Sequence, residues 1–299
     1  MSGAADAAIA NISARRAIAW RRRVDVVFQG LALLVLLIAL ACLGALIWDV
    51  VSDGAGRLSW TFITSFSSRR ASQAGIWSAL IGSIFVIVVT AALAVPVGVA
   101  AAIYLEEYGG RSVVARIIEL NITNLAAVPS IIYGLLGLGL FVRMMGMGRS
   151  VLAGASTLAL LVLPVVILST REALRGVPGS LREGSYALGA TKWQTIWHQV
   201  LPVAFPGVLT GLILALSRAI GETAPLIIAG AVTFATFAPD SIWSPFTVLP
   251  IQIFNWVSRP QTDFHANAAA GIIMLVLLLL SMNATAIWLR DRYQKKGAA

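Results

Sequence analysis

The chain has 299 residues, of which 59% are hydrophobic and only 12% are charged, and its mean hydropathy is +0.87. Soluble domains carry about 25% charged residues, so this composition excludes an ordinary soluble protein. The net charge of +9 and the pI near 10.6 would suit a nucleic-acid-binding protein. The basic residues, however, flank long apolar blocks, where they set topology and meet anionic lipid headgroups. We therefore expect a protein embedded in a lipid bilayer, with no nucleic-acid partner.

The first apolar block covers residues 26–48 and follows a basic segment that contains Arg15 and Arg16. A secretory signal peptide has an apolar core of only about 7 to 15 residues. Residues 1–25 are therefore expected to form a cytoplasmic tail, and residues 26–48 are expected to be an uncleaved first span.

Six apolar segments are long enough to cross a hydrocarbon layer of about 30 Å. They cover residues 26–48, 76–104, 117–142, 151–170, 206–228 and 266–289. The second segment is long, so we expect tilt or a kink at Pro96. These segments predict an all-α membrane protein with a six-span permease domain over residues 26–289 and a cytoplasmic C-terminal tail over residues 290–299.

The distribution of Lys and Arg predicts the orientation. Of the 22 basic residues, fifteen lie at the termini or in the loops on the side of the N-terminus, and Arg218 lies inside a span. Six lie in the loops of the other side: Arg57, Arg69, Arg70, Arg143, Arg149 and Arg259. The positive-inside rule therefore predicts that both termini are cytoplasmic.

Two connections are longer than a simple turn. The cytoplasmic loop, residues 171–203, is basic and rich in helix formers, so we expect short helices beneath the membrane. The outer loop, residues 231–265, contains aromatic residues that we expect to be interfacial anchors: Trp243, Phe246, Phe254 and Trp256.

Enzymatic motifs are missing from the sequence. A phosphate-binding Walker A loop needs a Gly-Lys pair, and none of the three lysines, Lys192, Lys295 and Lys296, follows a glycine. The histidines His198 and His265 have no acidic or thiol neighbour at metal-ligand spacing. We therefore predict a protein that is not an enzyme and that holds no cofactor or metal.

Within the cytoplasmic loop, residues 183–202 have the pattern of two short helices around a turn. Residues 181–188 are expected to form the first helix, with Glu183 in its first turn near the positive helix end. Gly189 permits a sharp turn, and Trp193 and Trp197 share one face of the second helix. Such a segment suits either docking on a partner protein or contact with lipid headgroups.

The fifth apolar segment contains Arg218 and Glu222, four residues apart and so on nearly the same helix face. A charged residue at this depth costs about 2.5 to 3.5 kcal/mol on insertion scales, which makes a functional role the default hypothesis. Pro225 cannot donate to the carbonyl of Gly221 and so leaves this oxygen free beside the pair. A purely structural ion pair between helices is the alternative.

The loop sequence REGSYALGATKWQTIWHQVLP resembles the EAA loop of ABC importer permeases. Glu183, Gly189, Leu201 and Pro202 match that pattern, whereas three positions depart from it: Gly184, Ser185 and Gln199. Other stretches are similar to phosphate-specific ABC permeases of the PstA type: VPVGVAAAIYLEEYG, NLAAVPSIIYGLLGLGLF, RAIGETAPL and FTVLPIQIFNW. The resemblance covers most of the chain from Ile76 onward.

This resemblance implies a type I ABC importer permease fold in a bacterial inner membrane. It implies four partners besides the lipid bilayer: a PstC-like permease, a PstB-like ATPase dimer, a PstS-like phosphate-binding protein and phosphate itself. It assigns ATPase coupling to Glu183, Gly189, Trp193, Trp197, Leu201 and Pro202. In the same reading, Arg218 and Glu222 face the substrate pathway, where the planar guanidinium suits phosphate.

Three other functions remain open from the sequence. The nearest is an importer permease for another anion, such as phosphonate, sulfate or molybdate. A proton-coupled secondary transporter would use Glu222 as its proton carrier, but no inverted repeat is visible. A membrane scaffold without transport would leave Arg218 and Glu222 unexplained.

Overall fold

A computed structural model describes residues 2–110 and 112–297, and the side chains of residues 20–22, 24–110 and 112–292. Its helices run in chain order as α1 (Ser2–Gly54), η1 (Ala55–Arg57), α2 (Trp60–Thr64), η2 (Ala71–Gln73), α3 (Trp77–Ile103), η3 (Tyr104–Tyr108), α4 (Val113–Ala126), α5 (Ser130–Gly137), η4 (Leu138–Met144), α6 (Val151–Arg175), α7 (Gly179–Ala187), α8 (Lys192–Thr195), η5 (Ile196–Val200), α9 (Leu201–Gly221), α10 (Ala224–Ala229), α11 (Leu249–Val257) and α12 (Asp263–Gly297). Three of these segments, η3, η4 and η5, are π-helical and continue the helix before or after them.

The chain divides into two compact units, Met1–Ser52 and Asp53–Ala299. The first unit contains α1 up to Ser52, which includes both the predicted tail and the first predicted span. Its apolar side chains from Val26 to Ile47 are exposed in the structure. This exposure is expected of a helix that is surrounded by lipid or by another protein. The second unit, called the body below, contains the other helices.

Within the residues that the structure describes, five helical segments are long and apolar enough to cross a membrane: Trp20–Arg57, Trp77–Tyr108, Val151–Arg175, Lys192–Gly221 and Asp263–Arg292. A sixth span results if the bent pair Val113–Ala126 and Ser130–Met144 counts as one. The prediction of an all-α fold with six spans is confirmed in this sense. α3 also continues as a helix through Pro96.

The third predicted span, residues 117–142, is wrong as a single helix. It is broken between α4 and α5, and the chain bends by 101° between Val113–Ala126 and Ser130–Met144. Pro129 lies at the break and has no N–H to donate, and it disfavours the helical conformation of Val128 before it. The last N–H groups of the first half, those of Ala127 and Val128, donate to the carbonyls of Asn124 and Leu125 at 3.1 Å.

The fifth predicted span, residues 206–228, has different ends in the structure. Its helix is already continuous from Lys192 through η5, and it ends at Gly221. Glu222 is extended, with φ −74° and ψ 121°, and α10 begins at Ala224. Pro225 therefore lies in the first turn of a new helix, where its missing N–H is tolerated, and does not kink a continuous span.

α6 is the central helix of the body. The side-chain oxygen of Ser150 accepts the N–H of Ala153 at 3.3 Å and so caps its start. Most of its apolar span is buried against neighbours, chiefly α3 and α9. A Cβ atom at Gly137 of α5 would lie 2.0 Å from the Thr157 hydroxyl of α6. Only glycine allows this close approach of the two helices.

The outer loop, residues 231–265, contains α11 and two of the largest buried side chains. Phe246 and Trp256 are fully buried, Phe246 in the cluster around α6 and Trp256 beside Phe62 and Phe264. The expectation that these two aromatic residues anchor the chain in the membrane interface is therefore wrong. Trp243 and Phe254 are exposed.

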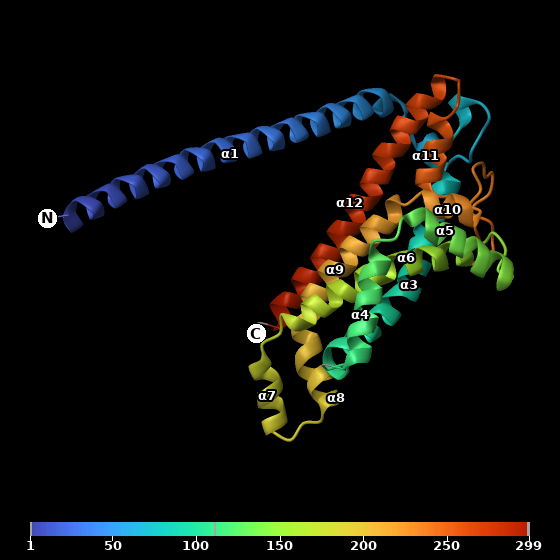
Figure 1. Ribbon diagram of the computed structural model, residues 1–299. Coiled ribbons are helices and arrows are strands. Elements are labelled where there is room, and N and C mark those ends of the chain that lie inside the picture. Colours follow the sequence, from blue (N-terminus) through green and yellow to red (C-terminus); the bar gives the residue numbers. More distant parts are fainter. Residues whose placement is uncertain (1, 111, 298–299) are drawn as a thin grey trace. The chain divides into compact units, whose positions relative to one another are not determined.

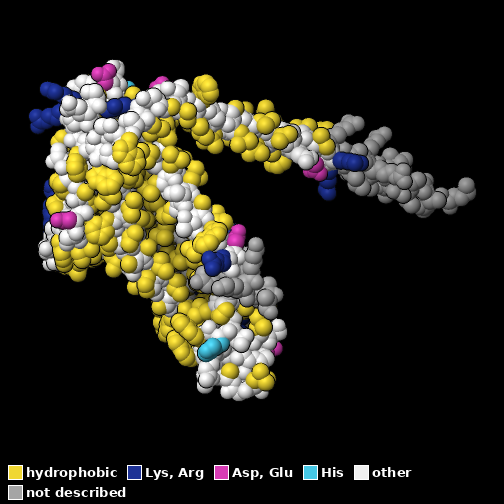
Figure 2. Space-filling model, turned by 180° about the vertical axis from the view of Figure 1, so that it is seen from behind, with side chains coloured by type: hydrophobic (Ala, Val, Ile, Leu, Met, Phe, Trp, Pro, Cys, Tyr) yellow, Lys and Arg dark blue, Asp and Glu magenta, His cyan; other side chains and the backbone are white. Residues whose placement is uncertain are grey.

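The body has two distinct ends (Figure 1). α7 and α8 project at one end, called the α7–α8 end below, and α10 and α11 lie at the other. α12 runs along α9 and has its C-terminal part at the α7–α8 end. The face of the body that Figure 2 shows is mostly apolar, and a group of basic side chains lies at its α11 end. This distribution is typical of a helical domain embedded in a bilayer.

Candidate functional site

The predicted coupling segment, residues 183–202, contains a tight turn between α7 and α8. Gly189 has a φ of +82°, a left-handed conformation that favours glycine. Its N–H donates to the carbonyl of Tyr186 at 2.9 Å, and the N–H of Ala190 donates to that of Ser185 at 3.2 Å. No atom lies within 4 Å of a Cβ built at Gly189, so the backbone conformation is what requires glycine. The predicted turn is present.

Glu183 occupies a different place from the one predicted. α7 begins at Gly179, directly after Pro178, so Glu183 lies beyond the first turn of the helix. The start of the helix is therefore not stabilised by this carboxylate. The side chain is exposed, and it pairs with no cation within the part of the chain whose side chains are described.

The second short helix starts at a capping box that the sequence reading missed. The Thr191 hydroxyl accepts the N–H of Gln194 at 3.4 Å, and Gln194 Oε1 accepts the N–H of Thr191 at 2.9 Å. The signal is Thr-x-x-Gln directly after the turn. From there α8, η5 and α9 form one helical run, Lys192–Gly221. A force on α8 therefore acts directly on a membrane-spanning helix.

Trp193 and Trp197 are brought together as predicted. Their rings stack with centroids 5.6 Å apart and an interplanar angle of 16°, and both residues are more than half exposed. They line a groove of about 940 Å³ between α3 and the run from α8 to α9. Leu201 and Pro202, at the start of α9, line the same groove. These four residues therefore flank a groove on the side of the body rather than the tip of the coupling segment.

The tip of the coupling segment is formed by Leu188, which sequence reasoning did not single out. This residue is 91% exposed, the largest value among the exposed large apolar residues of the described chain. Its N–H donates to the carbonyl of Gly184 at 3.2 Å, so the backbone that holds it is part of the turn. An apolar side chain held out from a hydrogen-bonded turn suits docking into a pocket of another protein.

Arg218 and Glu222 form an ion pair, with Arg218 Nε 3.4 Å from Glu222 Oε1. The pair lies at the C-terminal end of α9 and not in the interior of a continuous helix. The Arg218 side chain is 51% exposed and the Glu222 side chain 17% exposed. The Gly221 carbonyl, predicted to be free, accepts the Thr223 hydroxyl at 3.5 Å. The exposed guanidinium keeps donors available for an anion.

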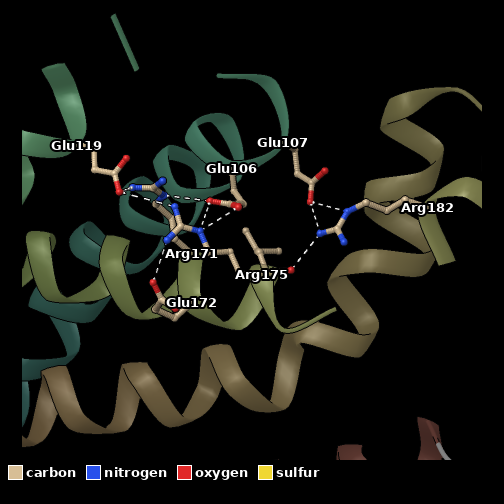
Figure 3. Close-up of polar contacts among 8 residues, drawn as sticks. Glu106, Glu107, Glu119, Arg171, Glu172, Arg175 and Arg182 are labelled. Carbon is tan, nitrogen blue, oxygen red and sulfur yellow. Dashed lines mark hydrogen bonds and ion pairs between the residues drawn. The ribbon is translucent and has the colours of Figure 1, made fainter. Parts of the chain in front are cut away.

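A second charged site lies at the α7–α8 end and was missed by the sequence reading (Figure 3). Arg171 of α6 is 5% exposed and bridges two carboxylates: its Nε lies 3.3 Å from Glu106 Oε2 and its Nη1 lies 3.0 Å from Glu119 Oε1. Arg175, one turn later, binds Glu106 at 3.0 Å and Glu172 at 3.2 Å. This cluster holds α6, η3 and α4 together.

Next to this cluster, Arg182 of α7 pairs with Glu107 of η3 (Figure 3). Arg182 Nη2 lies 2.7 Å from Glu107 Oε1, and the Glu107 side chain is only 6% exposed. The available signal was the pair of carboxylates Glu106 and Glu107 at the end of an apolar segment, together with arginines at the start of the cytoplasmic loop. Within the described residues, no group of three or more His, Cys, Asp or Glu is placed to hold a metal ion.

The helical body with its projecting α7–α8 segment has the type I fold of ABC importer permeases. Solved structures show this likeness of fold. The chain is similar to one from the inward-facing MetNI methionine ABC transporter, with a TM-score of 0.58, 19% identity and coverage of 73% of this chain and 94% of that one. It is also similar to a chain of a bacterial ABC transporter that imports the acidic polysaccharide alginate, with a TM-score of 0.56, 14% identity and coverage of 75% and 80%.

The chain belongs to the family of binding-protein-dependent transport system inner membrane components, whose sequence pattern matches residues 94–296. It is 33% identical to the probable ABC transporter permease protein YqgI of Bacillus subtilis, over 93% of this chain and 99% of that protein. It is 34% identical to the phosphate transport system permease protein PstA of Haemophilus influenzae, over 88% and 93%. The PstA 1 protein of Mycobacterium tuberculosis is also 34% identical, over 85% and 83%. This protein is therefore a multi-pass membrane protein of the importer permease family.

Proposed function

We propose that this chain is the permease subunit of an ATP-driven importer of inorganic phosphate. The observation that carries the proposal is its similarity to phosphate permeases named PstA, at 34% identity over 85% or more of this chain. The permease fold and the projecting coupling segment agree with it. The chain has no ATPase site of its own in this proposal, and a separate subunit hydrolyses ATP.

The coupling segment docks on the ATPase through its tip. Leu188 supplies the exposed apolar anchor, and the turn at Gly189 aims it. Closure of a PstB-like ATPase dimer then moves α7 and α8, and the helical run from Lys192 to Gly221 carries this movement into the membrane. Trp193 and Trp197 support the base of the segment rather than its tip.

The α7–α8 end faces the cytoplasm. The termini and loops on this side of the membrane contain more Lys and Arg than the loops on the other side. By the positive-inside rule, this excess supports a cytoplasmic location of the α7–α8 end and of both termini. A PstC-like permease completes the membrane part, and a PstS-like binding protein delivers phosphate to the opposite end, near α10 and α11. The location is the bacterial inner membrane.

Arg218 and Glu222 handle the anion on its pathway. Arg218 is half-exposed, and its planar fork of donors matches a phosphate group. Glu222 orients this fork through the 3.4 Å contact and adds a negative charge that limits how tightly phosphate binds. Both residues lie where α9 ends and the chain turns into α10, a break that suits the lining of a polar cavity.

The test is transport by a reconstituted complex. The chain is assembled in proteoliposomes with the second permease, the ATPase and the binding protein, and uptake of radiolabelled phosphate is measured with and without ATP. We expect ATP-dependent phosphate uptake that excess sulfate, molybdate or phosphonate does not block. Uptake of one of these anions instead would place the protein in the same importer class with another substrate. Uptake driven by a proton gradient without ATP would overturn the proposal.

A further inference from the structure

The adjacent carboxylates Glu106 and Glu107 bind two different parts of the protein (Figure 3). Both lie on η3, the π-helical turn that continues α3. Glu106 accepts hydrogen bonds from Arg171 and Arg175 of α6, with Nε to Oε2 distances of 3.3 and 3.0 Å. Glu107 accepts a hydrogen bond from Arg182 of α7 at 2.7 Å. One turn of chain thus joins a central membrane helix to α7, the helix in which the coupling segment begins.

Arg182 is held in a fixed position by contacts on more than one side. Besides its bond to Glu107, its Nη1 donates to the carbonyl of Val177 at 2.9 Å and its Nη2 donates to that of Leu174 at 3.0 Å. The side chains of Arg182 and Glu107 are 20% and 6% exposed. A guanidinium with directed bonds on several sides cannot swing freely. The pair therefore connects α7 to η3 as a stiff link, unlike an exposed ion pair.

We propose that Glu107 and Arg182 are positioning residues that transmit the movement of α7 to α3, an inference that rests on the proposed function. The coupling segment reaches α9 through the continuous chain from α8. It reaches α3 through space, by the Arg182–Glu107 pair and by the ammonium of Lys192, which lies 4.9 Å from the Tyr108 ring centroid. A groove separates α3 from α9 at this end. The Arg182–Glu107 pair bridges from α7 to η3, so α3 follows when α7 moves.

The neighbouring contacts extend this link across the body. When η3 moves, Glu106 acts on Arg171 and Arg175 of α6, and Arg171 in turn holds Glu119 of α4. A buried ion pair gives little net stability compared with an apolar pair of the same size. Two adjacent buried or half-buried carboxylates on one turn are therefore better explained by a need for directed connections than by stability alone.

The sharpest test is Glu107→Gln, which removes the charge but keeps the size of the side chain and the bonds of Arg182 to Leu174 and Val177. Glu172→Gln is the matched control, since Glu172 belongs to the neighbouring cluster but its side chain is 72% exposed. Each full complex is reconstituted, and phosphate transported per ATP hydrolysed is measured. We expect this ratio to fall about tenfold or more in Glu107→Gln and to stay unchanged in the control.

Several outcomes decide the matter. An unchanged ratio with less assembled complex would show that the pair is only structural and would overturn the inference. The charge swap of Glu107→Arg with Arg182→Glu is expected to recover the ratio several-fold over either single change, and a swap no better than the single changes would contradict it. Should Glu107→Gln fail to assemble, Arg182→Lys, which keeps the charge without the fork, gives the same readout. A wild-type complex that imports another anion would overturn the phosphate assignment alone, and the ratio measured with that anion would still decide the role of the pair.

Discussion

Leu188 is the residue that the structure adds most clearly to the coupling segment. It is 91% exposed at the tip, so changing it disturbs no packing within the chain. We expect Leu188→Asp to weaken co-purification of the ATPase about tenfold or more, a loss of ~1.4 kcal/mol, because a carboxylate would be buried in an apolar pocket of the partner. Ile242→Asp, the same kind of change in an exposed residue of the outer loop, is the control and should leave ATPase binding intact. Equal ATPase binding by wild type and Leu188→Asp would remove the tip from the docking site.

Arg218 is the residue at which charge and geometry can be separated. Arg218→Lys keeps the positive charge but loses the planar fork, so phosphate uptake per complex is expected to fall about tenfold. Arg218→Gln should be about tenfold worse again, because the charge is also lost. The side chain is 51% exposed, so the pair with Glu222 stabilises the fold little and the amount of complex should hardly change.

The double variant Arg218→Gln with Glu222→Gln distinguishes the two roles of this pair. A purely structural pair predicts fewer complexes in the single variants and a return of both assembly and uptake in the double variant. A role on the anion pathway predicts normal assembly and low uptake in the double variant. Normal uptake per complex in this variant would contradict the pathway role.

At the residue scale, sequence reasoning found the positions whose types are unusual in their setting. Arg218 and Glu222 are charges in an apolar segment, and they were correctly predicted to lie close together. Gly189 precedes a short helix, and the turn predicted there is present. The partners of Glu106 and Glu107 were not predicted. Those partners, Arg171, Arg175 and Arg182, are about 65 to 75 residues away along the chain. They come near only because α3 and η3 pack against α6 and the chain then turns from α6 into α7.

The proposed docking on the ATPase depends on the turn between α7 and α8. Gly189→Pro removes the N–H that donates to Tyr186 and cannot adopt a φ of +82°. We expect the subunit to remain in the membrane but to lose ATPase co-purification, because the tip is no longer aimed. Gly189→Ala should cause a smaller loss, since a left-handed residue with a Cβ costs about 1 to 2 kcal/mol.

Gly184→Ala is the matched control for this turn. Gly184 lies inside α7, its φ is not positive, and no atom lies within 4 Å of a Cβ built there. Alanine is favoured over glycine in a helix by up to about 1 kcal/mol, so this variant should keep or improve coupling. Full ATPase binding and phosphate uptake by Gly189→Pro would reduce the segment to a lipid-contacting helix.

At the element scale, apolar length predicted where the spans lie but not where each helix breaks. The bend after α4 follows from Pro129, whose effect on helix direction depends on what packs around it. The end of α9 at Gly221 gives no clear sequence signal, because Glu222 and Thr223 are tolerated in a helix. The burial of Phe246 depends on how the outer loop packs on α6, and that of Trp256 on how α11 packs against α2, α3 and α12, neither of which the local pattern contains.

At the scale of the whole molecule, the proposed function gives the two ends of the body different tasks. The α7–α8 end has the coupling segment and two charged links, and the opposite end has α10, α11 and the Arg218–Glu222 pair near the end of α9. The run from Lys192 to Gly221 connects them, since it starts in the coupling segment and ends beside Glu222. A movement of α8 therefore reaches the proposed anion site along one helix of about 45 Å, at 1.5 Å per residue.

The assignment of these ends to the two sides of the membrane is tested by cysteine labelling in a Cys42→Ala background, which removes the one native cysteine. Ser180, at the start of α7, and Gln261, between α11 and α12, are exposed, and they lie at opposite ends of the body. Since fifteen basic residues favour a cytoplasmic α7–α8 end, an impermeant thiol reagent should label Gln261→Cys in intact cells. It should label Ser180→Cys only after the membrane is opened, which serves as the control for reactivity. Labelling of Ser180→Cys in intact cells would reverse the orientation, and an ATPase in the cytoplasm then could not reach Leu188.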